Sequence, residues 1–428
     1  MTSRNNSGIW KVAVLAVFFV ALFAAPASAS VVYSLGDCLE IASRMHPGIT
    51  GAAASVASSR GRLAQTAASD RLQVDGTVSA SRSGTSMSEG SAYSVGVNAS
   101  VKLYDANRNK YSLAASRATL SATELEAAHT LSGVRANVKS AFLNLLLSYE
   151  IERQREDAVN AFTQHLEQAR GFYEAGSKPW YDVTKAEVDL GGAQMSLAEA
   201  TSNLRNARAS LANAMGLDPS EDFDIERSGM DIFSVPDEAI SEAEALAAEN
   251  RPDYIASALK MDAGRATLSA EARYDAATIT LSGGYGGRAD GSFDFGRDWN
   301  TRVSMSIPIA DGGTARARAD VARANVDSLG SSREKLRQDI LLEVSRAKSD
   351  IEKARERIRI SGLTLVNAEE SRKLAEGRYE TGVGTTLELT DALLSYTDAI
   401  LASKQAHYDL QVAIVNLERA VGLEFGRE

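Results

Sequence analysis

Two pairs of segments in this chain alternate between apolar and polar residues at every second position. A period of two is typical of a β-strand whose faces meet different surroundings. A stretch rich in Ser, Gly and Asp separates the two segments of each pair, so the pattern predicts two β-hairpins, over residues 72–103 and 278–309. In the first hairpin one face collects the apolar side chains Leu72, Val74, Val78, Ala80, Tyr93, Val95, Val97, Ala99, Val101 and Leu103.

The length and chemistry of these strands indicate where they lie. Any antiparallel sheet with one solvated face shows such alternation. Runs of about ten residues, with hydroxyls on one face and aromatic residues near the ends, favour strands of the outer membrane. The aromatic residues are Tyr93, Tyr285 and Trp299. Four strands are too few to close a barrel, and an open edge in lipid leaves backbone groups unpaired. We therefore expect the edges to meet other subunits, with three copies supplying twelve strands.

Long helices are predicted after each hairpin. Residues 106–175 and 314–381 contain no proline and no cluster of turn residues, and at 1.5 Å per residue each stretch would extend roughly 100 Å. Apolar positions spaced alternately by four and three predict a coiled-coil seam. The seam positions are Ile340, Val344, Ala347, Ile351, Ala354 and Ile358 in the later stretch, and Val134, Val138, Ala141, Leu145, Tyr149, Phe162, Leu166, Ala169 and Tyr173 in the earlier one. Shorter helices are expected over 35–69, 181–214, 238–274 and 386–421.

The chain is an internal duplication. Motifs of the first half recur 205 residues later before residue 92 and 206 residues later after it, as in Gly176 with Gly382 and Asp182 with Glu388. An internal repeat of this length implies that the two halves of the chain have the same order of helices and strands. One residue has been inserted, between Arg82 and Tyr93 or between Arg288 and Trp299, and surface loops tolerate such insertions.

The duplication sets the expected domain organisation. We expect a first structural repeat over 30–217 and a second over 237–428. The segment 218–236 between them contains Pro219, Gly229 and Pro236, which break regular structure. It is expected to be an irregular connector that lies against the helices.

The N-terminus has the pattern of a secretory signal peptide over residues 1–29. Arg4 and Lys11 precede an apolar run that ends at Ala27-Ser28-Ala29, a small-residue cleavage site. The run is too short to cross a bilayer as a helix. Without the signal, 44 basic and 56 acidic residues give a net charge of −12. Such acidity argues against a nucleic-acid partner.

The residues that usually carry catalysis or bind metals are sparse. The single cysteine, Cys38, can form no internal disulfide, and its place far beyond the apolar run argues against a lipid anchor. The four histidines are scattered and show no spacing of metal ligands. We find no phosphate-binding loop and no nucleophile elbow. The sequence therefore predicts no cofactor, no metal site and no enzymatic activity.

The order of these elements resembles that of the TolC-type outer-membrane efflux and type I secretion channels. The most specific motifs are SIPIADGG at 306–313 and YETGVGTTLELTDAL at 379–393. The resemblance covers essentially the whole chain after the signal. It implies an all-α coiled-coil barrel plus a transmembrane β-barrel, built by a homotrimer in the outer membrane and extending into the periplasm. The protein would be a porin-like channel, the exit duct of a tripartite efflux pump or a type I secretion system.

The resemblance also assigns roles to residues at the two helical corners. Gly176 and Gly382 would end the long helices in the left-handed conformation. In the family the corners form a constricted periplasmic gate. Glu388 and Asp391 match the acidic pair that rings it, and Tyr379 and Asp182 match residues that tether the resting state. Thr385 and Glu388 also have the spacing of a helix-capping box, and Asp391 could simply be a solvated helix residue.

One position departs from the family pattern. Where the best-known members have an arginine, two residues after the second corner glycine, this chain has Gly384. Lys178 has the equivalent rank at the first corner, so we hypothesise that it replaces the arginine and bridges to Glu388 or Asp391.

Three classes of function remain in view. The leading interpretation is a passive duct in outer-membrane lipid, opened by a periplasmic adaptor (a membrane fusion protein) and an inner-membrane pump of the ABC or RND type. The alternative is a periplasmic coiled-coil adaptor or structural protein without a pore, which the lipid-compatible hairpins disfavour. A secreted enzyme is the third class. The sequence does not identify the cargo, which could be drugs, metals, siderophores or a secreted protein.

Overall fold

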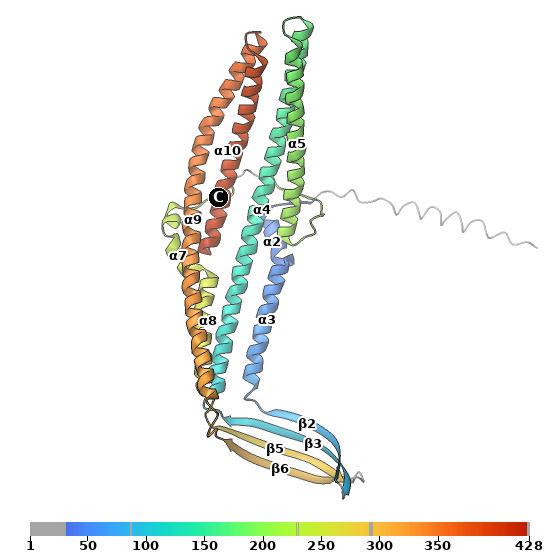
Figure 1. Ribbon diagram of the computed structural model, residues 1–428, viewed down its shortest axis with the longest axis vertical. Helices are drawn as coiled ribbons and strands as arrows, with labels where there is room; N and C mark the ends of the chain where they lie inside the picture. The colour runs from blue at the N-terminus through green and yellow to red at the C-terminus, as the bar shows by residue number, and fades with distance from the viewer. Residues whose placement is uncertain (1–30, 86–87, 228, 230, 291–293, 426–428) are drawn as a thin grey trace, which may run out of the picture.

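The computed structural model describes residues 31–85, 88–227, 229, 231–290 and 294–425, so the predicted signal peptide lies outside the described residues. The chain forms two extended helical hairpins that stand on a curved sheet (Figure 1). The elements of the first half are β1 (Val31–Tyr33), α2 (Leu35–Met45), α3 (Pro47–Ala68), β2 (Gln73–Thr85), β3 (Ser88–Tyr104), α4 (Arg108–Glu174) and α5 (Trp180–Met215). They are followed by β4 (Phe223–Ile225), α6 (Asp237–Ser241), α7 (Ala243–Asn250), α8 (Pro252–Glu271), β5 (Thr278–Asp290), β6 (Gly296–Ser306), α9 (Thr314–Glu380) and α10 (Thr386–Val421).

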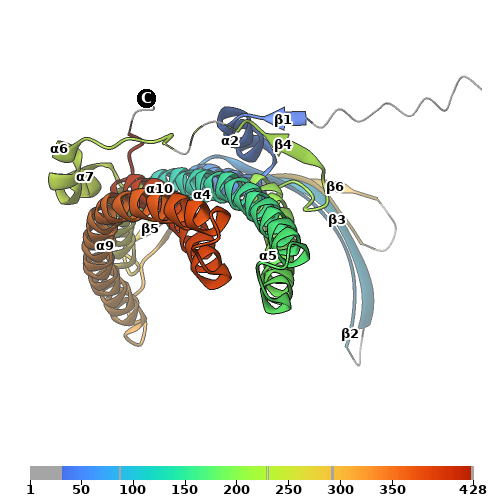
Figure 2. The ribbon, with the colours of Figure 1, turned by 90° about the horizontal axis from the view of Figure 1, so that it is seen from above.

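The helical part repeats with equal element lengths. The long helices α4 and α9 each contain 67 residues, and the return helices α5 and α10 each contain 36. At 1.5 Å per residue the long helices extend about 100 Å. In the upper half α9, α10, α4 and α5 are neighbours in that order, and seen from above they form a curved row (Figure 2). In the lower half α3 lies beside α4, and α8 lies between α4 and α9.

The shorter helices are interrupted where the sequence predicted continuous ones. The stretch 35–69 divides into α2 and α3 at His46, and 238–274 divides into α6, α7 and α8, with the last break at Arg251. His46 and Arg251 both have extended backbones, with ψ of 125° and 116°. Each precedes a proline, whose ring disfavours the helical conformation of the residue before it. The duplicated proline motif thus marks a helix start rather than a helix interior.

Two glycines stack the shorter helices end to end. Gly216 and Gly422 follow the last residues of α5 and α10 with φ of +81° and +78°. A Cβ on Gly216 would lie 2.7 Å from the Cα of His46, and one on Gly422 would lie 3.1 Å from the Cα of Arg251. The return helices therefore end directly against the helix starts at α3 and α8. The chain therefore contains four nearly continuous helical columns.

The four long strands form one antiparallel sheet in the order β2-β3-β5-β6. The pairing of β3 with β5 joins the two repeats. The second hairpin ends earlier than the predicted residue 309, because Pro308 has no N–H to donate to a ladder. Strands β2 and β6 are the sheet edges, and apolar side chains on them face solvent, with Val78 84% exposed and Trp299 74% exposed.

The connector 218–236 is more ordered than expected. Residues Phe223–Ile225 form β4, which pairs in parallel with β1 at the start of the described chain. Phe223, Ile225 and Phe233 are buried, and the side chain of Gln411 on α10 bonds the backbone of residue 233 as both acceptor and donor. The three-residue strands were missed because so short a pairing leaves no periodic pattern.

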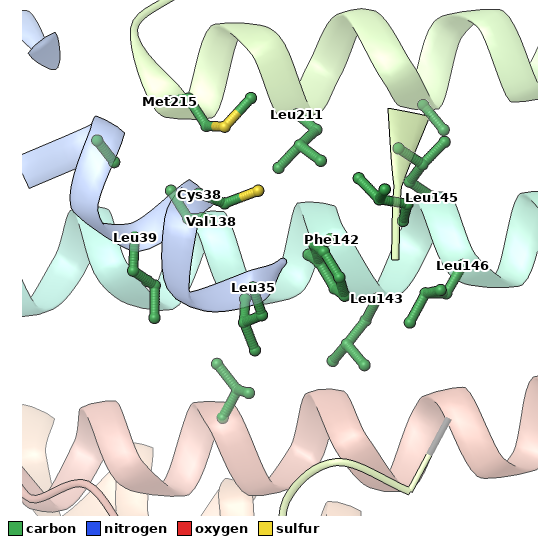
Figure 3. Close-up of a cluster of buried hydrophobic side chains, with 14 of the residues drawn as sticks. Leu35, Cys38, Leu39, Val138, Phe142, Leu143, Leu145, Leu146, Leu211 and Met215 are labelled. Carbon is green, nitrogen blue, oxygen red and sulfur yellow. The ribbon is translucent and has the colours of Figure 1, made fainter. Parts of the chain in front are cut away.

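The largest apolar cluster lies where this connector meets the helices. It joins α2, α4 and α5, and Figure 3 shows side chains from all three helices, among them Cys38, Phe142 and Leu211, gathered in one cluster. Burial raises the pKa of the Cys38 thiol to about 12, so this cysteine is a packing residue. Most of the predicted seam positions are buried as expected, with four differences. Ala141, Tyr149 and Ile358 are only partly buried, and Tyr173 is exposed.

Candidate functional site at the helical corners

The two helical corners have the same backbone. Gly176 and Gly382 adopt left-handed conformations with φ of +70° and +76°. At the first corner the N–H groups of Gly176 and Ser177 donate to the carbonyls of Tyr173 and Phe172. The matching pair at the second corner joins residues 382 and 383 to residues 379 and 378. These are the bonds of a Schellman motif, which favours glycine because its left-handed residue is hindered by a Cβ.

The return helices begin differently at the two corners. At α10 the Thr385 hydroxyl accepts a hydrogen bond from the backbone N–H of Glu388 at 3.2 Å. The Glu388 carboxylate does not complete the capping box, because it accepts a bond from Arg378 Nε at 2.9 Å instead. At α5 the equivalent position is Pro179, which has no side-chain cap. The second corner therefore holds its acidic residue in an ion pair across the turn.

Lys178 joins the two corners, but through other groups than the sequence suggested. Its ammonium donates to the carbonyl oxygen of Gly384 at 3.0 Å and lies 3.5 Å from the centre of the Tyr379 ring. Within the protomer it therefore bridges to backbone and to an aromatic face rather than to Glu388 or Asp391. The cation that meets Glu388 is Arg378. Lys178 and Gly384 are 206 residues apart and so occupy the same rank of the duplication.

The backbone of residues 378 and 379 approaches Gly384 closely and leaves little room for a side chain. A Cβ at this position would lie 2.9 Å from the backbone nitrogen of Tyr379 and 3.0 Å from the carbonyl carbon of Arg378. An arginine would not fit this tight corner without backbone movement. The absence of a side chain at Gly384 and the direction of Lys178 are thus parts of one local arrangement.

Tyr379 is the centre of the contact between the hairpins. Its side chain is 0% exposed, although it lies at the last turn of α9. The ring makes edge contacts with His165 and Phe172 of α4, at centroid distances of 5.0 and 5.5 Å. Its hydroxyl accepts a 3.5 Å bond from Thr386. Burial raises the pKa of the Tyr379 hydroxyl, and the nearby Asp182 carboxylate adds to that effect.

The remaining predicted site residues lie around this contact. Asp182, in the first turn of α5, raises the pKa of Lys178, although burial of the ammonium has the larger and opposite effect. Asp391 is exposed on α10, three residues after Glu388. Because residues three apart share a helix face, Glu388 and Asp391 present their charges together.

Sequence reasoning missed a second polar link and a histidine. Thr390 of α10 donates to Asp189 of α5 at 3.0 Å, and Asp189 is also paired with Lys185. His165 is buried on α4, next to the seam position Leu166. One feature of the sequence could have drawn attention to His165, because this titratable residue lies between the seam positions Phe162 and Leu166. Nothing in the sequence placed it against Tyr379, because the two are more than two hundred residues apart.

The corners combine exposed charges with a buried aromatic contact. Among the described residues, no group of His, Cys, Asp and Glu is arranged to hold a metal ion. Within the same part of the chain, no helix is both long and apolar enough to cross a bilayer. The exposed carboxylates can attract cations, and the contact around Tyr379 can hold the two hairpins together.

Comparison with known proteins identifies relatives of this fold. Over 178 residues the chain is 32% identical to outer membrane protein OprJ of Pseudomonas aeruginosa, a match that spans 41% of this chain and 37% of that protein. It is 21% identical to outer membrane protein TolC of Vibrio cholerae over 353 residues, 80% of this chain and 79% of the relative. The crystal structure of the Campylobacter jejuni CmeC outer membrane channel superposes with a TM-score of 0.82 at 18% identity, covering 91% of this chain and 86% of that one.

A family model assigns the chain directly. The model described as outer membrane efflux protein matches residues 39–217 and again residues 245–423, which together are most of the chain. The two matches end 206 residues apart, which is the spacing of the internal duplication after residue 92. The helical tube with a β-sheet at one end and the resemblance inferred from the sequence are therefore confirmed, and the chain belongs to the outer membrane efflux protein family.

Proposed function

We propose that three copies of this chain form the exit duct of a tripartite pump, a tube that crosses the outer membrane and extends into the periplasm. One observation supports the proposal most directly. The β-sheet and the row of helices both end in unpaired edges, and these edges lie on the same two sides of the chain. The sheet ends in open edges at β2 and β6, and the helical row ends at α5 and α9 (Figure 2). Three such arcs give twelve strands and twelve helical columns, and closing both at once leaves a hollow passage.

The free faces of the end helices support closure by copies of the chain. On α5 the exposed apolar residues Tyr181, Val188 and Met195 repeat every seven positions, which is the spacing of a coiled-coil seam. On α9 beyond residue 350 the exposed large apolar residues are Ile360, Leu363, Val366 and Leu374. A row of this kind on each end of the arc fits a contact between α5 of one protomer and α9 of the next.

The same closure would bring the acidic residues of the second corner together. Three copies of Glu388 and Asp391 place six carboxylates near one axis, where they repel one another and attract cations. Arg378 partly neutralises Glu388 within each protomer. We therefore assign Glu388 and Asp391 to a cation-selective entrance, and Tyr379, Lys178 and Asp182 to the contact that holds the corners in place.

The tips also provide a surface for a periplasmic partner. Trp180, Tyr181, Val383 and Leu387 are exposed apolar side chains at the two corners. An adaptor that engages these tips would couple the duct to an inner-membrane pump, of the ABC or RND type. The competing interpretation, a periplasmic adaptor without a pore, is disfavoured because it leaves the apolar face of the sheet without a lipid partner.

Single-channel recording in a planar bilayer tests the duct. The purified mature protein should give stepwise, cation-selective conductance, and Glu388→Gln with Asp391→Asn should reduce the cation preference. Glu380→Gln is the matched control, since it removes one exposed charge at the same tip from α9 rather than α10. A soluble monomer that gives no conductance, and that fractionates away from the outer membrane, would refute the proposal.

A further inference from the structure

His165 is a buried titratable residue without a hydrogen-bond partner. Its side chain is 2% exposed, and both ring nitrogens lack a partner among the described residues. A buried polar group left unpaired costs about 1–3 kcal/mol, so most are paired and each exception calls for an explanation. A leucine or phenylalanine at this place would pack without that penalty. The histidine is therefore not explained by packing.

The duplication shows that the helical hairpin itself does not need this histidine. The equivalent rank in the second repeat, 206 residues later, is Ser371, and it is exposed on α9. Repeats that share helix lengths and corner geometry thus differ at this position. What distinguishes His165 is its place between the two hairpins, where α4 faces the last turn of α9.

The ring of His165 takes part in the contact that joins the corners. It meets the Tyr379 ring edge to face, with an interplanar angle of 68°. The Lys178 ammonium lies over the face of the same Tyr379 ring and donates a hydrogen bond to the carbonyl oxygen of Gly384. Together with the Thr390 to Asp189 bond, these contacts link the two hairpins near their tips. A change of charge on His165 would therefore act directly on this link.

The charges that face His165 come from two elements besides its own helix. Lys178 at the corner and Lys185 on α5 disfavour a second positive charge, whereas Asp189 and Asp182 on α5 favour it. The largest effect is burial, which lowers the pKa of His165 below its ordinary value of 6.5. The observed packing therefore selects the neutral ring, since a buried imidazolium would lie without an acceptor beside the lysine-bearing ring of Tyr379.

We propose that His165 is a proton-sensitive latch: protonation of its ring releases the contact between the two hairpins and opens the tip of the duct. The latch rests on the proposed function, because it regulates the same entrance. Separation of the hairpins would expose the ring to water and restore its ordinary pKa, so protons bind the separated state more strongly. The contact is thus fully stable above about pH 6.5 and weakens as the pH falls below that value.

Conductance and fluorescence of the trimer test this latch separately from the duct. After removal of the predicted signal peptide, the chain contains two tryptophans, Trp180 at the first corner and Trp299 in the sheet. In a Trp299→Phe variant, the fluorescence of Trp180 therefore reports on the tip. Between pH 7.5 and 5.5 the open fraction in planar bilayers should rise severalfold, with a parallel change in Trp180 emission. Each unit by which burial lowers the pKa allows up to about a tenfold change in the open-to-resting ratio.

Two variants make the outcome specific to His165. His165→Phe keeps an aromatic ring against Tyr379 but does not titrate, so both pH responses should be lost. His129→Gln is the control, since it removes a half-exposed histidine from the same helix α4 and should leave both responses intact. A pH-independent parent protein, or a His165→Phe variant that keeps the response, would overturn the latch. If no conductance is seen at any pH, the duct is refuted and the Trp180 emission alone decides the latch.

Discussion

The two helical corners differ in their side chains although their backbones match. Both end a 67-residue helix at a left-handed glycine. At the first corner Tyr173 is 44% exposed and contacts Trp180, a neighbour in its own hairpin. At the second corner the equivalent Tyr379 is fully buried against α4 of the other hairpin. Duplication therefore preserved the turn and allowed the surroundings to diverge.

The difference follows from the position of each hairpin in the curved row. The second hairpin has the first as its neighbour through α10 and α4, so its corner can bury a tyrosine within the protomer. The first hairpin ends the row at α5, whose outer face has no neighbour in the protomer (Figure 2). We infer that the second corner has become the internal contact, while the first corner supplies the lysine that clamps it and the surface left for other chains.

Replacement of the two tyrosines should show the largest contrast. Tyr379→Ala removes a fully buried aromatic side chain and should cost about 3–5 kcal/mol of stability at the tip. Tyr173→Ala removes a half-exposed one and should cost under about 1 kcal/mol in the isolated protomer. Thermal unfolding and protease cleavage at the corners measure both. Equal effects in the assembled protein would mean that a neighbouring chain buries Tyr173 as well.

A Cβ at Gly384 should have the next largest effect. Gly384→Ala forces contact with the backbone of residues 378 and 379 and should cost roughly 1–3 kcal/mol, as overpacking does. Gly192→Ala is the control, because Gly192 lies within α5 with open space around it, and there alanine should be neutral or stabilising. The midpoint of thermal unfolding measures the loss of stability. In cells that make the variant, entry of a small antibiotic measures whether the tip has loosened. A tolerated alanine at 384 would show that the corner is looser than this geometry.

Removal of the lysine charge should have a moderate effect. Lys178→Met keeps the apolar stem but loses the hydrogen bond to Gly384 and the contact with the Tyr379 face, together worth about 1–2 kcal/mol. The resting conductance of the trimer should rise. Lys353→Met, at an exposed position on α9, serves as the control. Unchanged conductance in Lys178→Met would show that residues other than Lys178 hold the tip in its resting conformation.

The smallest effect is expected from the exposed ion pair. Arg378→Ala frees the Glu388 carboxylate, and because both side chains are about half exposed the stability should change by only about 0.2–1 kcal/mol. Cation selectivity should increase as the acidic charge is no longer neutralised, most clearly at low salt. Reversal potentials in a salt gradient measure this. A decrease in selectivity would contradict the assignment of Glu388 to the entrance.

The sequence predicted the elements whose signals are long and periodic. The 67-residue helices, the left-handed glycines and the order of strands and helices were all expected, because period and glycine placement are local properties. It failed where signals were short or depended on a distant partner. The breaks at His46 and Arg251 were overlooked although a proline follows each. The strands β1 and β4 had no pattern to find.

For the corners, the sequence named the residues but not their partners. The duplication identified Gly176 and Gly382, and together with the family resemblance it drew attention to Tyr379 and Lys178. Only the packing of one hairpin against the other decided that Lys178 contacts Gly384, that Arg378 meets Glu388 and that His165 lies beside Tyr379. The physical reason is that turn geometry is fixed by neighbouring residues along the chain, whereas the choice of an ionic or aromatic partner is fixed by which distant surface is brought within a few ångströms.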